Sequence, residues 1–430
     1  MSKLKKVEEI LLFLTLLFLP TQLGKHFWPQ FSYVYSLKVD YLSPTVYFWD
    51  ILMVGLFVVW ILQKPKVNKT GLNLFLFFLI TQGLSLFGAF NMGAGLVRLE
   101  QYTIAGFFGV YLASAEYKGL LNKIYLPISL GILGESVLAI LQFIKGGTLG
   151  LWVLGERAFS ISTPGIAKFD FFGLQFLRPY GTFSHPNVLA GFALLTLVIL
   201  SVTKDMTKLY SSANRLRMTI RLAAVLLAGF TIFLTMSRTA IAAGFISALI
   251  LFKRKWLVLM GVLLLVLSPI LFTRFSSLFN FDNLTLLRRE ELIESAGQIF
   301  LRHPFFGVGL NNFIPTVASD LTIGPSRFLQ PVHNIFLLAL SETGLVGLIG
   351  LVFLIGFPIL SSLRKQGSIN NWYRFRSVGR PIKSGMTVLP WLIIIFLGMF
   401  DHYFLTLPQG YRLLFLVWGL SFSMLKCWRE

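Results

Sequence analysis

Arginine and histidine residues stand at the ends of several apolar runs, where their chemistry suits a phosphorylated substrate. Arg238 separates two apolar runs, Arg178 begins RPYGTFSHPN, Arg288 and Arg289 open a mixed segment, and His333 precedes a long apolar run. The planar guanidinium of arginine binds phosphate through two parallel hydrogen bonds and keeps its charge. Histidine accepts a proton near neutral pH. These residue types predict a diphosphate site with a histidine as proton acceptor.

The composition indicates which elements must position these residues. The chain has 430 residues, of which 55% are hydrophobic, 15% aromatic and 13% charged. A soluble domain is about 25% charged, so this composition excludes most soluble classes. Because about 20 apolar residues span a bilayer, the chain has enough of them for on the order of twelve spans. The single cysteine, Cys427, excludes a disulfide or a thiolate metal site within one chain.

Apolar runs bounded by proline, glycine or charged clusters predict twelve membrane spans. The first run has no small-residue cleavage site and is interpreted as a span rather than a signal peptide. The short pair between 222 and 252 is compatible with tilted, re-entrant or kinked helices. The fold class is an all-α polytopic integral membrane protein, a single membrane domain over residues 1–430. The predicted spans are 8–24, 44–62, 71–90, 99–115, 124–144, 184–203, 222–237, 239–252, 256–272, 333–361, 386–401 and 411–425.

The lysine and arginine clusters set the orientation of these spans, because basic residues are enriched in cytoplasmic loops. With twelve spans, every dense basic cluster falls on the side of the two termini, and nearly all of the +20 net charge lies there. The N- and C-termini are therefore predicted to be cytoplasmic. Since the orientation accounts for the charge, no nucleic-acid partner is expected.

Two outer segments, 145–184 and 273–332, are too long to be simple turns. Both are rich in Phe, Leu and Gly rather than in Ser, Glu and Lys, which predicts that they are ordered loops. The second contains a predicted helix at residues 286–301. Because the candidate arginines and His333 lie in or beside these segments, the predicted site is on the outer, periplasmic side.

Structural interpretations compete with each functional one. An arginine at the end of a span can extend to lipid headgroups, and His333 can be an interfacial residue. His185, His303 and His402 stand at predicted membrane edges, which favours structural roles. Asp40 stands alone in the first outer loop, and no spacing of His, Asp or Glu resembles a metal site. Neither a metal nor another cofactor is expected.

Glycines near the candidate residues have conformational interpretations. Gly344, Gly347 and Gly350 follow one another on the predicted tenth span and predict close helix packing. Gly307 and Gly309 of GVGLNNF superficially resemble part of a dinucleotide fingerprint, but no strand precedes them. A turn is the predicted structure there.

Four segments together resemble the O-antigen ligase and polymerase superfamily: RPYGTFSHPNVLAGF, LTMSRTA, LRHPFFGVGLNNF and VHNIFLLALSETGLVG. The last is the most specific. His333 and Asn334 are followed after nine residues by Gly344 and after two more by Gly347, which is similar to the family's His-Asn/Ser/Gln-x9-Gly-x-x-Gly/Thr/Tyr signature. The resemblance defines a ligase-like motif core at 178–350 and extends to the rest of the chain by topology.

The resemblance implies an inverting, metal-independent glycosyltransferase that uses a glycan on undecaprenyl diphosphate in the outer leaflet of the plasma (inner) membrane. It places the family's essential histidine at His333 and its outer arginines at Arg178 and Arg238, which are the predicted catalytic residues. The acceptor is open: lipid A core for ligases, another lipid-linked glycan for polymerases, or Ser and Thr of a protein. The predicted substrate-binding residues are Arg288, Asn334, His185, Asn187 and Glu342.

Two other classes of protein are alternatives to this enzyme. A flippase or polyprenyl-diphosphate carrier also needs many spans and buried arginine, but such carriers often contain inverted repeats and broken helices, which the sequence does not show. A purely structural membrane scaffold leaves the arginine and histidine set unexplained. The polar groups gather at the outer ends of the spans, which favours an enzyme at the outer surface.

Overall fold

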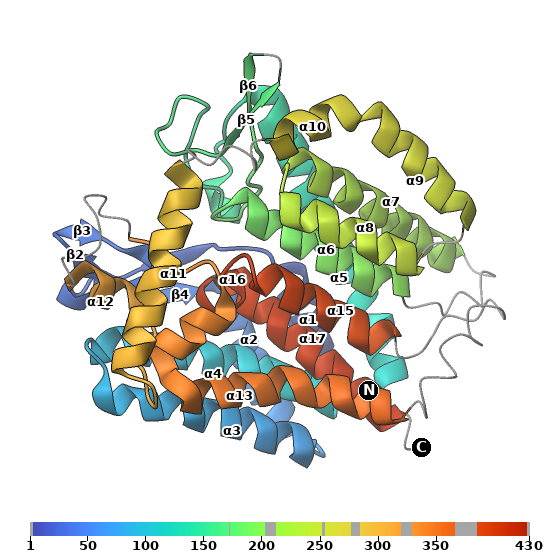
Figure 1. Cartoon of the computed structure of the whole chain (residues 1–430). Coiled ribbons are helices and arrows are strands. Elements are labelled where there is room, and N and C mark those ends of the chain that lie inside the picture. Colours follow the sequence, from blue (N-terminus) through green and yellow to red (C-terminus); the bar gives the residue numbers. More distant parts are fainter. Residues whose placement is uncertain are drawn as a thin grey trace.

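The computed structural model describes residues 3–171, 173–202, 212–251, 254–276, 284–319, 329–365 and 385–427, and most of them are helical (Figure 1). In chain order the helices are α1 (Lys3–Leu17), α2 (Phe48–Leu62), α3 (Lys69–Leu84), α4 (Met92–Ser114), α5 (Tyr117–Lys145), α6 (Pro186–Val202), α7 (Ser212–Leu234), α8 (Arg238–Leu251), α9 (Arg254–Val266), α10 (Ser268–Ser276), α11 (Leu284–Arg302), α12 (Phe313–Ser319), α13 (Ile335–Lys365), α15 (Gly385–Gly398), α16 (Tyr403–Thr406) and α17 (Pro408–Cys427).

Each predicted span overlaps one of these helices. Within the described ranges, four helical segments are long and apolar enough to cross a membrane, and α2, α6, α8 and the end of α15 are shorter apolar helices. The mostly helical fold with helices of membrane-spanning length is thereby confirmed, while the number of spans stays a prediction. The four long segments are Lys69–Gly88, Gly119–Lys145, Arg215–Leu234 and Ile335–Arg364.

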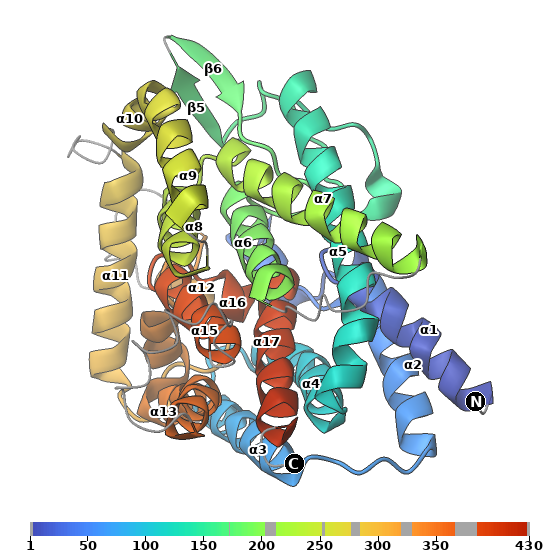
Figure 2. The same cartoon turned by 90° about the vertical axis from the view of Figure 1, so that its right-hand side faces the viewer.

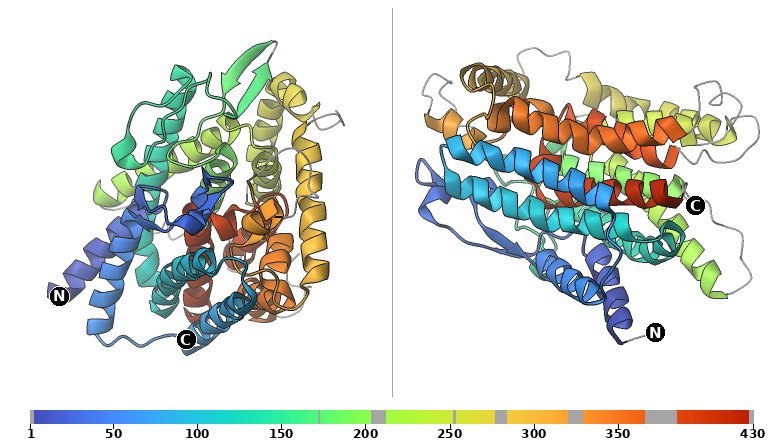
Figure 3. Two further views of the ribbon diagram at one scale, coloured as in Figure 1. Left: turned by 90° about the vertical axis from the view of Figure 1, so that its left-hand side faces the viewer. Right: turned by 90° about the horizontal axis from the view of Figure 1, so that it is seen from below.

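The long helices α3, α4, α13 and α17 run along one common axis (Figure 1). Helix α17 packs against α4, and α13 packs against α3. Both chain ends lie at one end of this bundle, and the first short strands lie at the other (Figures 1 and 3). The assignment of the end with the termini to the cytoplasm stays a prediction.

Three short antiparallel strand pairs are a departure from the predicted all-α class. They pair β1 (Gly24–His26) with β4 (Thr45–Tyr47), β2 (Tyr33–Val34) with β3 (Leu37–Lys38), and β5 (Lys168–Phe171) with β6 (Leu174–Leu177). The predicted first span reached residue 24, but α1 ends at Leu17, three residues before Pro20. Proline has no backbone N–H and cannot continue a helix, so the following chain is free to form β1.

The two segments predicted as outer loops contain regular elements in their described parts, while their position outside the membrane stays a prediction. The segment 145–184 carries β5 and β6, and α11 confirms the helix predicted at 286–301. Helix α11 buries Leu292, Ala296 and Ile299 on one stripe and packs against α13. Figure 1 shows α11 crossing the bundle axis instead of following it. This course brings the start of α11 toward the segment before α13.

Helix α13 contains a break at Gly344. Gly344 has φ +62° and ψ −164°, which interrupts the helix. The segment around Phe305 docks at this break, where the N–H of Val346 donates to the Phe305 carbonyl at 3.1 Å and the N–H of Gly309 donates to the Glu342 carbonyl at 2.8 Å. Gly309 has φ +103°, which confirms the predicted turn in GVGLNNF. A Cβ at Gly344 would overlap the Phe305 carbonyl.

The two later glycines of α13 lie at its contact with α3. A Cβ at Gly350 would overlap the side chain of Thr81 on α3. Gln82 of α3 donates its Nε2 to the Gly347 carbonyl at 2.9 Å. Close packing of α13 on α3 therefore requires a small residue at Gly350, whereas a Cβ at Gly347 would overlap the side chain of Thr343 on α13 itself.

Candidate functional site

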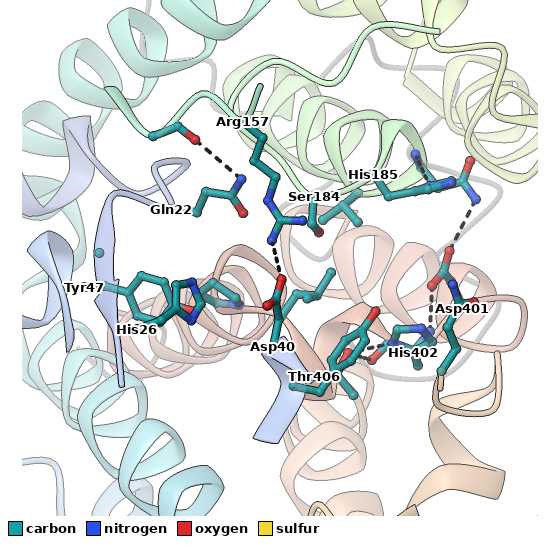
Figure 4. Close-up of a pocket in the computed structure, with 18 of the residues that line it drawn as sticks. Gln22, His26, Asp40, Tyr47, Arg157, Ser184, His185, Asp401, His402 and Thr406 are labelled. Atoms are coloured by element: carbon teal, nitrogen blue, oxygen red, sulfur yellow. Dashed lines mark hydrogen bonds and ion pairs between the residues drawn. The ribbon is translucent and has the colours of Figure 1, made fainter. Parts of the chain in front are cut away.

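A cavity of about 710 Å³ opens at the end of the bundle that carries the first strands. Its walls come from β1, β4, the 3₁₀ turn η2 (Asp40–Leu42), α4, α11 and the segments before α6, α13 and α16 (Figure 4). Four of the predicted site residues line it: His333, His185, Asn187 and Arg288. Residues that are 148 positions apart in the chain are thereby brought to one cavity.

A carboxylate joins the histidines at one end of the cavity. Asp401 accepts the backbone N–H of His402 at 2.8 Å and the Nδ2 of Asn187 at 3.4 Å (Figure 4). The His402 ring meets the His333 ring edge to face, with centroids 5.2 Å apart and planes at 70°. His402 Nδ1 lies 2.6 Å from the hydroxyl of Thr406. Asp401 and His402 thus position the wall beside His333.

Burial controls the protonation of these groups. It lowers the pKa of His185 and of His402 to about 3, the latter against the opposing charge of Asp401. Burial and the charge of Arg289 lower the pKa of His333, while Asp401 acts to raise it. Burial acts to raise the pKa of Asp401, but the neighbouring histidines outweigh it and the net pKa is lowered. Near neutral pH the rings are neutral and Asp401 is ionised.

His333 is distinguished from His185 by its hydrogen bonds. His185 Nδ1 accepts the backbone N–H of Asn187 at 3.1 Å, which fixes the proton of a neutral ring on Nε2. His333 Nδ1 is buried and has no hydrogen-bond partner among the described residues. His333 also lines the cavity, so its neutral ring suits a proton acceptor for a bound hydroxyl group.

Arg178 lies behind the cavity wall rather than in it. Its side chain is buried, its Nε donates to the Thr235 carbonyl at 2.6 Å, and its Nη2 donates to Asn187 Oδ1 at 2.7 Å. Asn187 therefore bridges Arg178 and Asp401. This bridge ties the segment before α6 to the loop before α16.

Arg178, Arg238, Arg274 and Arg289 form a group that we call the arginine cluster. Burial lowers the pKa of Arg178 to about 9, and the charges of Arg274, Arg238 and Arg289 contribute. Burial lowers the pKa of Arg274 to about 10, with contributions from Arg238 and Arg289. The Nε of Arg274 donates to the Met236 carbonyl at 3.0 Å. Because the members repel one another, a bound anion stabilises the cluster.

Two predicted binding residues have structural positions outside the cavity lining. Asn334 begins α13: its Oδ1 accepts the N–H of Phe336 at 2.9 Å and of Leu337 at 3.1 Å, as an N-cap does. Glu342 is buried in α13, and its Oε1 accepts the N–H of Phe313 at 3.1 Å. Both residues therefore stabilise α13, the helix that follows His333 in the chain.

Several residues that line the cavity were not predicted from the sequence as site residues. Asp401 had a usable signal, because an acid is the last residue of the predicted apolar span 386–401. His402, for which a structural role was favoured, is indeed buried, but it also lines the cavity. Asp40, predicted to stand alone, forms an ion pair with Arg157 at 3.2 Å. The residue spacing gave no signal for this pair, because 117 positions separate its members.

The described residues contain no group of three or more His, Cys, Asp or Glu side chains placed to hold a metal ion. Positive charge near the cavity comes instead from arginine. Arg289 and Arg288 are on α11, Arg274 is on α10 and Arg238 begins α8. Elements that are distant in the sequence thus supply one positively charged region beside His333.

The segment that contains most of these residues matches a known protein family. Residues 223–352, less than half of the chain, match the family model described as O-Antigen ligase. The matched segment runs from α7 into α13 and contains Arg238, Arg274, Arg289 and His333. No curated protein matches the chain.

Proposed function

We propose that the chain, whose residues 223–352 match the O-antigen ligase family model, is a membrane glycosyltransferase-like enzyme of this superfamily. It would transfer a glycan from undecaprenyl diphosphate to an acceptor hydroxyl at the outer face of the plasma membrane. The observation that carries the proposal is the arginine cluster beside a cavity lined by His333. The cluster suits a diphosphate, and the histidine suits a hydroxyl nucleophile.

The diphosphate is the leaving group of the proposed reaction. As the bond between the anomeric carbon and the phosphate oxygen breaks, negative charge grows on that oxygen. Fixed positive charges in a site of low polarity stabilise such charge without reorganisation. Arg238, Arg274 and Arg289 supply it, while Arg178 is held by Thr235 and Asn187 behind them. The proposed mechanism needs no metal because the arginines provide the charge.

His333 is the proposed proton acceptor for the attacking hydroxyl. Its neutral ring takes the proton as the oxygen attacks the anomeric carbon from the side opposite the diphosphate, so the configuration inverts. Asp401 then stabilises the resulting imidazolium, because its charge acts to raise the pKa of His333. General-base assistance of this kind contributes about 10²–10⁴ in rate.

Substitution of the two central residues tests the proposal. His333→Ala and Arg238→Ala should each abolish glycan transfer while the protein remains in the membrane. Matched controls are His303→Ala and Arg302→Ala, because both residues are exposed near the end of α11 and neither lines the cavity. Full transfer activity in the His333 or the Arg238 variant would contradict the role assigned to that residue.

A polymerase of the same superfamily is the alternative function. Both reactions use the same donor and differ in the acceptor, so the site described above serves either. A deletion followed by a glycan length profile separates them: loss of a polymerase leaves single repeat units on the final acceptor, whereas loss of a ligase leaves long chains on undecaprenyl diphosphate. A lipid-linked glycan flippase is less well supported, because it gives no role to His333, the proposed proton acceptor that lines the cavity beside the arginine cluster.

A further inference from the structure

A groove of about 350 Å³ lies between the ends of α3, α4, α13 and α17. It is at the end of the bundle that carries the chain termini, which faces the viewer in Figure 2, and thus opposite the cavity that His333 lines. We call it the terminal groove. Its lining combines apolar side chains of α13 and α17 with a basic segment that leads into α3.

The wall that α13 and α17 contribute is apolar. Phe357 and Phe422 stack with ring centroids 5.7 Å apart and planes at 2°, and Leu425 lines the groove one turn after Phe422. Phe422 is buried, whereas Phe357 is half-buried. Carbon surfaces of this kind make favourable dispersion contacts with hydrocarbon and offer nothing to a polar group. This wall therefore suits an acyl chain.

The segment before α3 brings positive charge to the groove. Lys66 and Lys69 both line it and are exposed. Neither forms an ion pair with a carboxylate of the described residues, and no Asp or Glu is among the described residues that line the groove. Two like charges without a counter-charge repel each other, and an anion near both is attracted by both. The lysines therefore favour an anionic ligand.

The neutral polar groups of the lining are mostly bonded within the protein. Asn68 donates its Nδ2 to the Ala113 carbonyl at 3.1 Å, and its Oδ1 accepts the N–H of Gly71 at 3.0 Å. Ser114 Oγ accepts the N–H of Asn68 at 3.0 Å and donates to the Val110 carbonyl at 2.7 Å. The groove thus offers a ligand positive charge and apolar surface, but few neutral hydrogen-bonding groups. This combination argues against a sugar as the occupant.

We propose that the terminal groove binds an anionic phospholipid of the bilayer, with its phosphate beside Lys66 and Lys69 and an acyl chain along Phe357 and Phe422. Basic pockets between membrane helices on the cytoplasmic side bind anionic headgroups, and the lysines of this end predict that it is cytoplasmic. Ser361 lines the groove, is half-buried and has no hydrogen bond with the described residues, so its hydroxyl can donate to the phosphate. The site has no part in glycan transfer, so its test is independent of the proposed function.

Two pairs of variants separate the groove from its surroundings. Lys66→Gln removes one of the charges, and its control is Lys64→Gln, because Lys64 is exposed two residues earlier and does not line the groove. Ser361→Phe fills part of the groove, and its control is Leu360→Phe, because Leu360 is 67% exposed and lies outside the lining. All four side chains are exposed or half-buried, so the variants should remain folded.

The probe is phosphatidylglycerol with a photoreactive diazirine in one acyl chain. The full-length protein is placed in vesicles of phosphatidylcholine that contain a small fraction of the probe, irradiated, and analysed by peptide mapping. We expect labelled peptides around Phe357 and Phe422, and unlabelled phosphatidylglycerol should compete. Lys66→Gln should reduce this labelling about fivefold, which is the contribution of one lysine near an anionic headgroup. Ser361→Phe should reduce it at least as much, and the two controls should leave it unchanged.

Other occupants of the groove would give different results, and each would overturn the proposal. Equal labelling by diazirine phosphatidylcholine, without competition from phosphatidylglycerol, would show bulk lipid in the groove. Loss of labelling in the presence of millimolar glycerol phosphate would show that the groove holds a free phosphate ester. No labelling of these peptides by any lipid probe would show that lipid does not enter.

Thermal unfolding in detergent provides a second readout. Phosphatidylglycerol added to the delipidated full-length protein should raise its Tm, and phosphatidylcholine should not, because a ligand that binds only the folded state stabilises it. The rise should be smaller in Lys66→Gln and Ser361→Phe than in their controls. Equal rises in all four variants would place the stabilising lipid elsewhere and contradict the proposal.

Discussion

The protonation state of His333 should make the rate of glycan transfer depend on pH. Its pKa is lowered mainly by burial, so the ring stays neutral down to a pH below the ordinary value of about 6.5. We expect the rate of transfer to be constant through neutrality and to fall only on the acidic side, as His333 becomes protonated. A pH profile of kcat/KM in vesicles measures this. An acidic limb well above pH 6.5 would contradict the burial of this ring.

The two charges nearest His333 should move that acidic limb in opposite directions. Arg289 acts to lower the pKa of His333 and Asp401 acts to raise it. Arg289→Gln should therefore shift the limb to higher pH, and Asp401→Asn should shift it to lower pH. Because removal of Arg289 also weakens the diphosphate site, the comparison uses the position of the limb and not the maximal rate. Shifts in the same direction would contradict the effect assigned to at least one of the two charges.

The buried neutral histidines His185 and His402 should also make the stability of the protein depend on pH. His185 and His402 have pKa values of about 3 in the folded protein, whereas an unfolded histidine titrates near 6.5. Above 6.5 neither state binds a proton and the two groups contribute nothing. As pH falls below 6.5, only the unfolded chain gains protons, so stability is lost. We expect a loss of about 2 kcal/mol per histidine at pH 5, measured as a lower Tm.

His185→Asn provides the control for this effect. Its side-chain oxygen can still accept an N–H from Asn187, and asparagine does not titrate. The difference in Tm between pH 7 and pH 5 should shrink in this variant. An unchanged difference would show that His185 has the same pKa in the folded and the unfolded protein.

The residue types of the proposed site were predictable from the sequence, but the contacts that join these residues were not. Arg178, Arg238 and His333 could be chosen because charged groups at the ends of apolar spans are costly and informative. Their partners could not, because Asn187 meets Asp401 over 214 positions of sequence. Periodicity and spacing report only neighbours along the chain. The proximity of Arg274 to Arg238 likewise depends on how α10 packs.

At the scale of elements, Gly344 is the position whose replacement should change most. Gly344→Ala puts a side chain at φ +62° and against the Phe305 carbonyl. This backbone conformation, with positive φ and extended ψ, is essentially restricted to glycine and costs roughly 1–3 kcal/mol for other residues, and the overlap adds to it. We expect a fall in Tm and a loss of transfer, since the first half of α13 begins beside His333.

Gly356→Ala is the matched control on the same helix. A Cβ at Gly356 meets no atom within 4 Å, and its φ is not positive. Alanine there should be neutral or stabilise by about 0.5–1 kcal/mol, because glycine is the more flexible residue in a helix. If both variants lowered Tm equally, the break in α13 would not be the reason.

Elements with strong apolar patterns were the easiest to predict. The spans and α11 needed only hydrophobic content and spacing, which are local properties of the sequence. The strand pairs between α1 and α2 were missed, because β1 and β4 are three residues each and their pairing joins Gly24 to Tyr47. The role of Gly344 was also missed: helical glycines suggest packing, and only the docked segment at Phe305 reveals a break.

The orientation of the whole molecule can be tested with its own cysteine. Cys427 ends α17 at the predicted cytoplasmic side. In intact cells a membrane-impermeant maleimide should leave Cys427 unlabelled and should label it after permeabilisation. Ser162→Cys, an exposed position in the first large outer loop, should be labelled before permeabilisation in a Cys427→Ser background. The reverse pattern would invert the topology and place the cavity on the cytoplasmic side.

Because α11 crosses the bundle axis, a tilt of this helix about one end would displace the residues at its other end. Its far end is fixed where the segment around Phe305 bonds to α13, and Arg289 lies 13 residues before its last residue, Arg302. At 1.5 Å per residue this arm is about 20 Å long. A tilt of about 10° at the fixed end therefore moves Arg289 by about 3 Å, the length of one hydrogen bond. A tilt of this size in one helix would be enough to form or break a hydrogen bond between Arg289 and a bound anion.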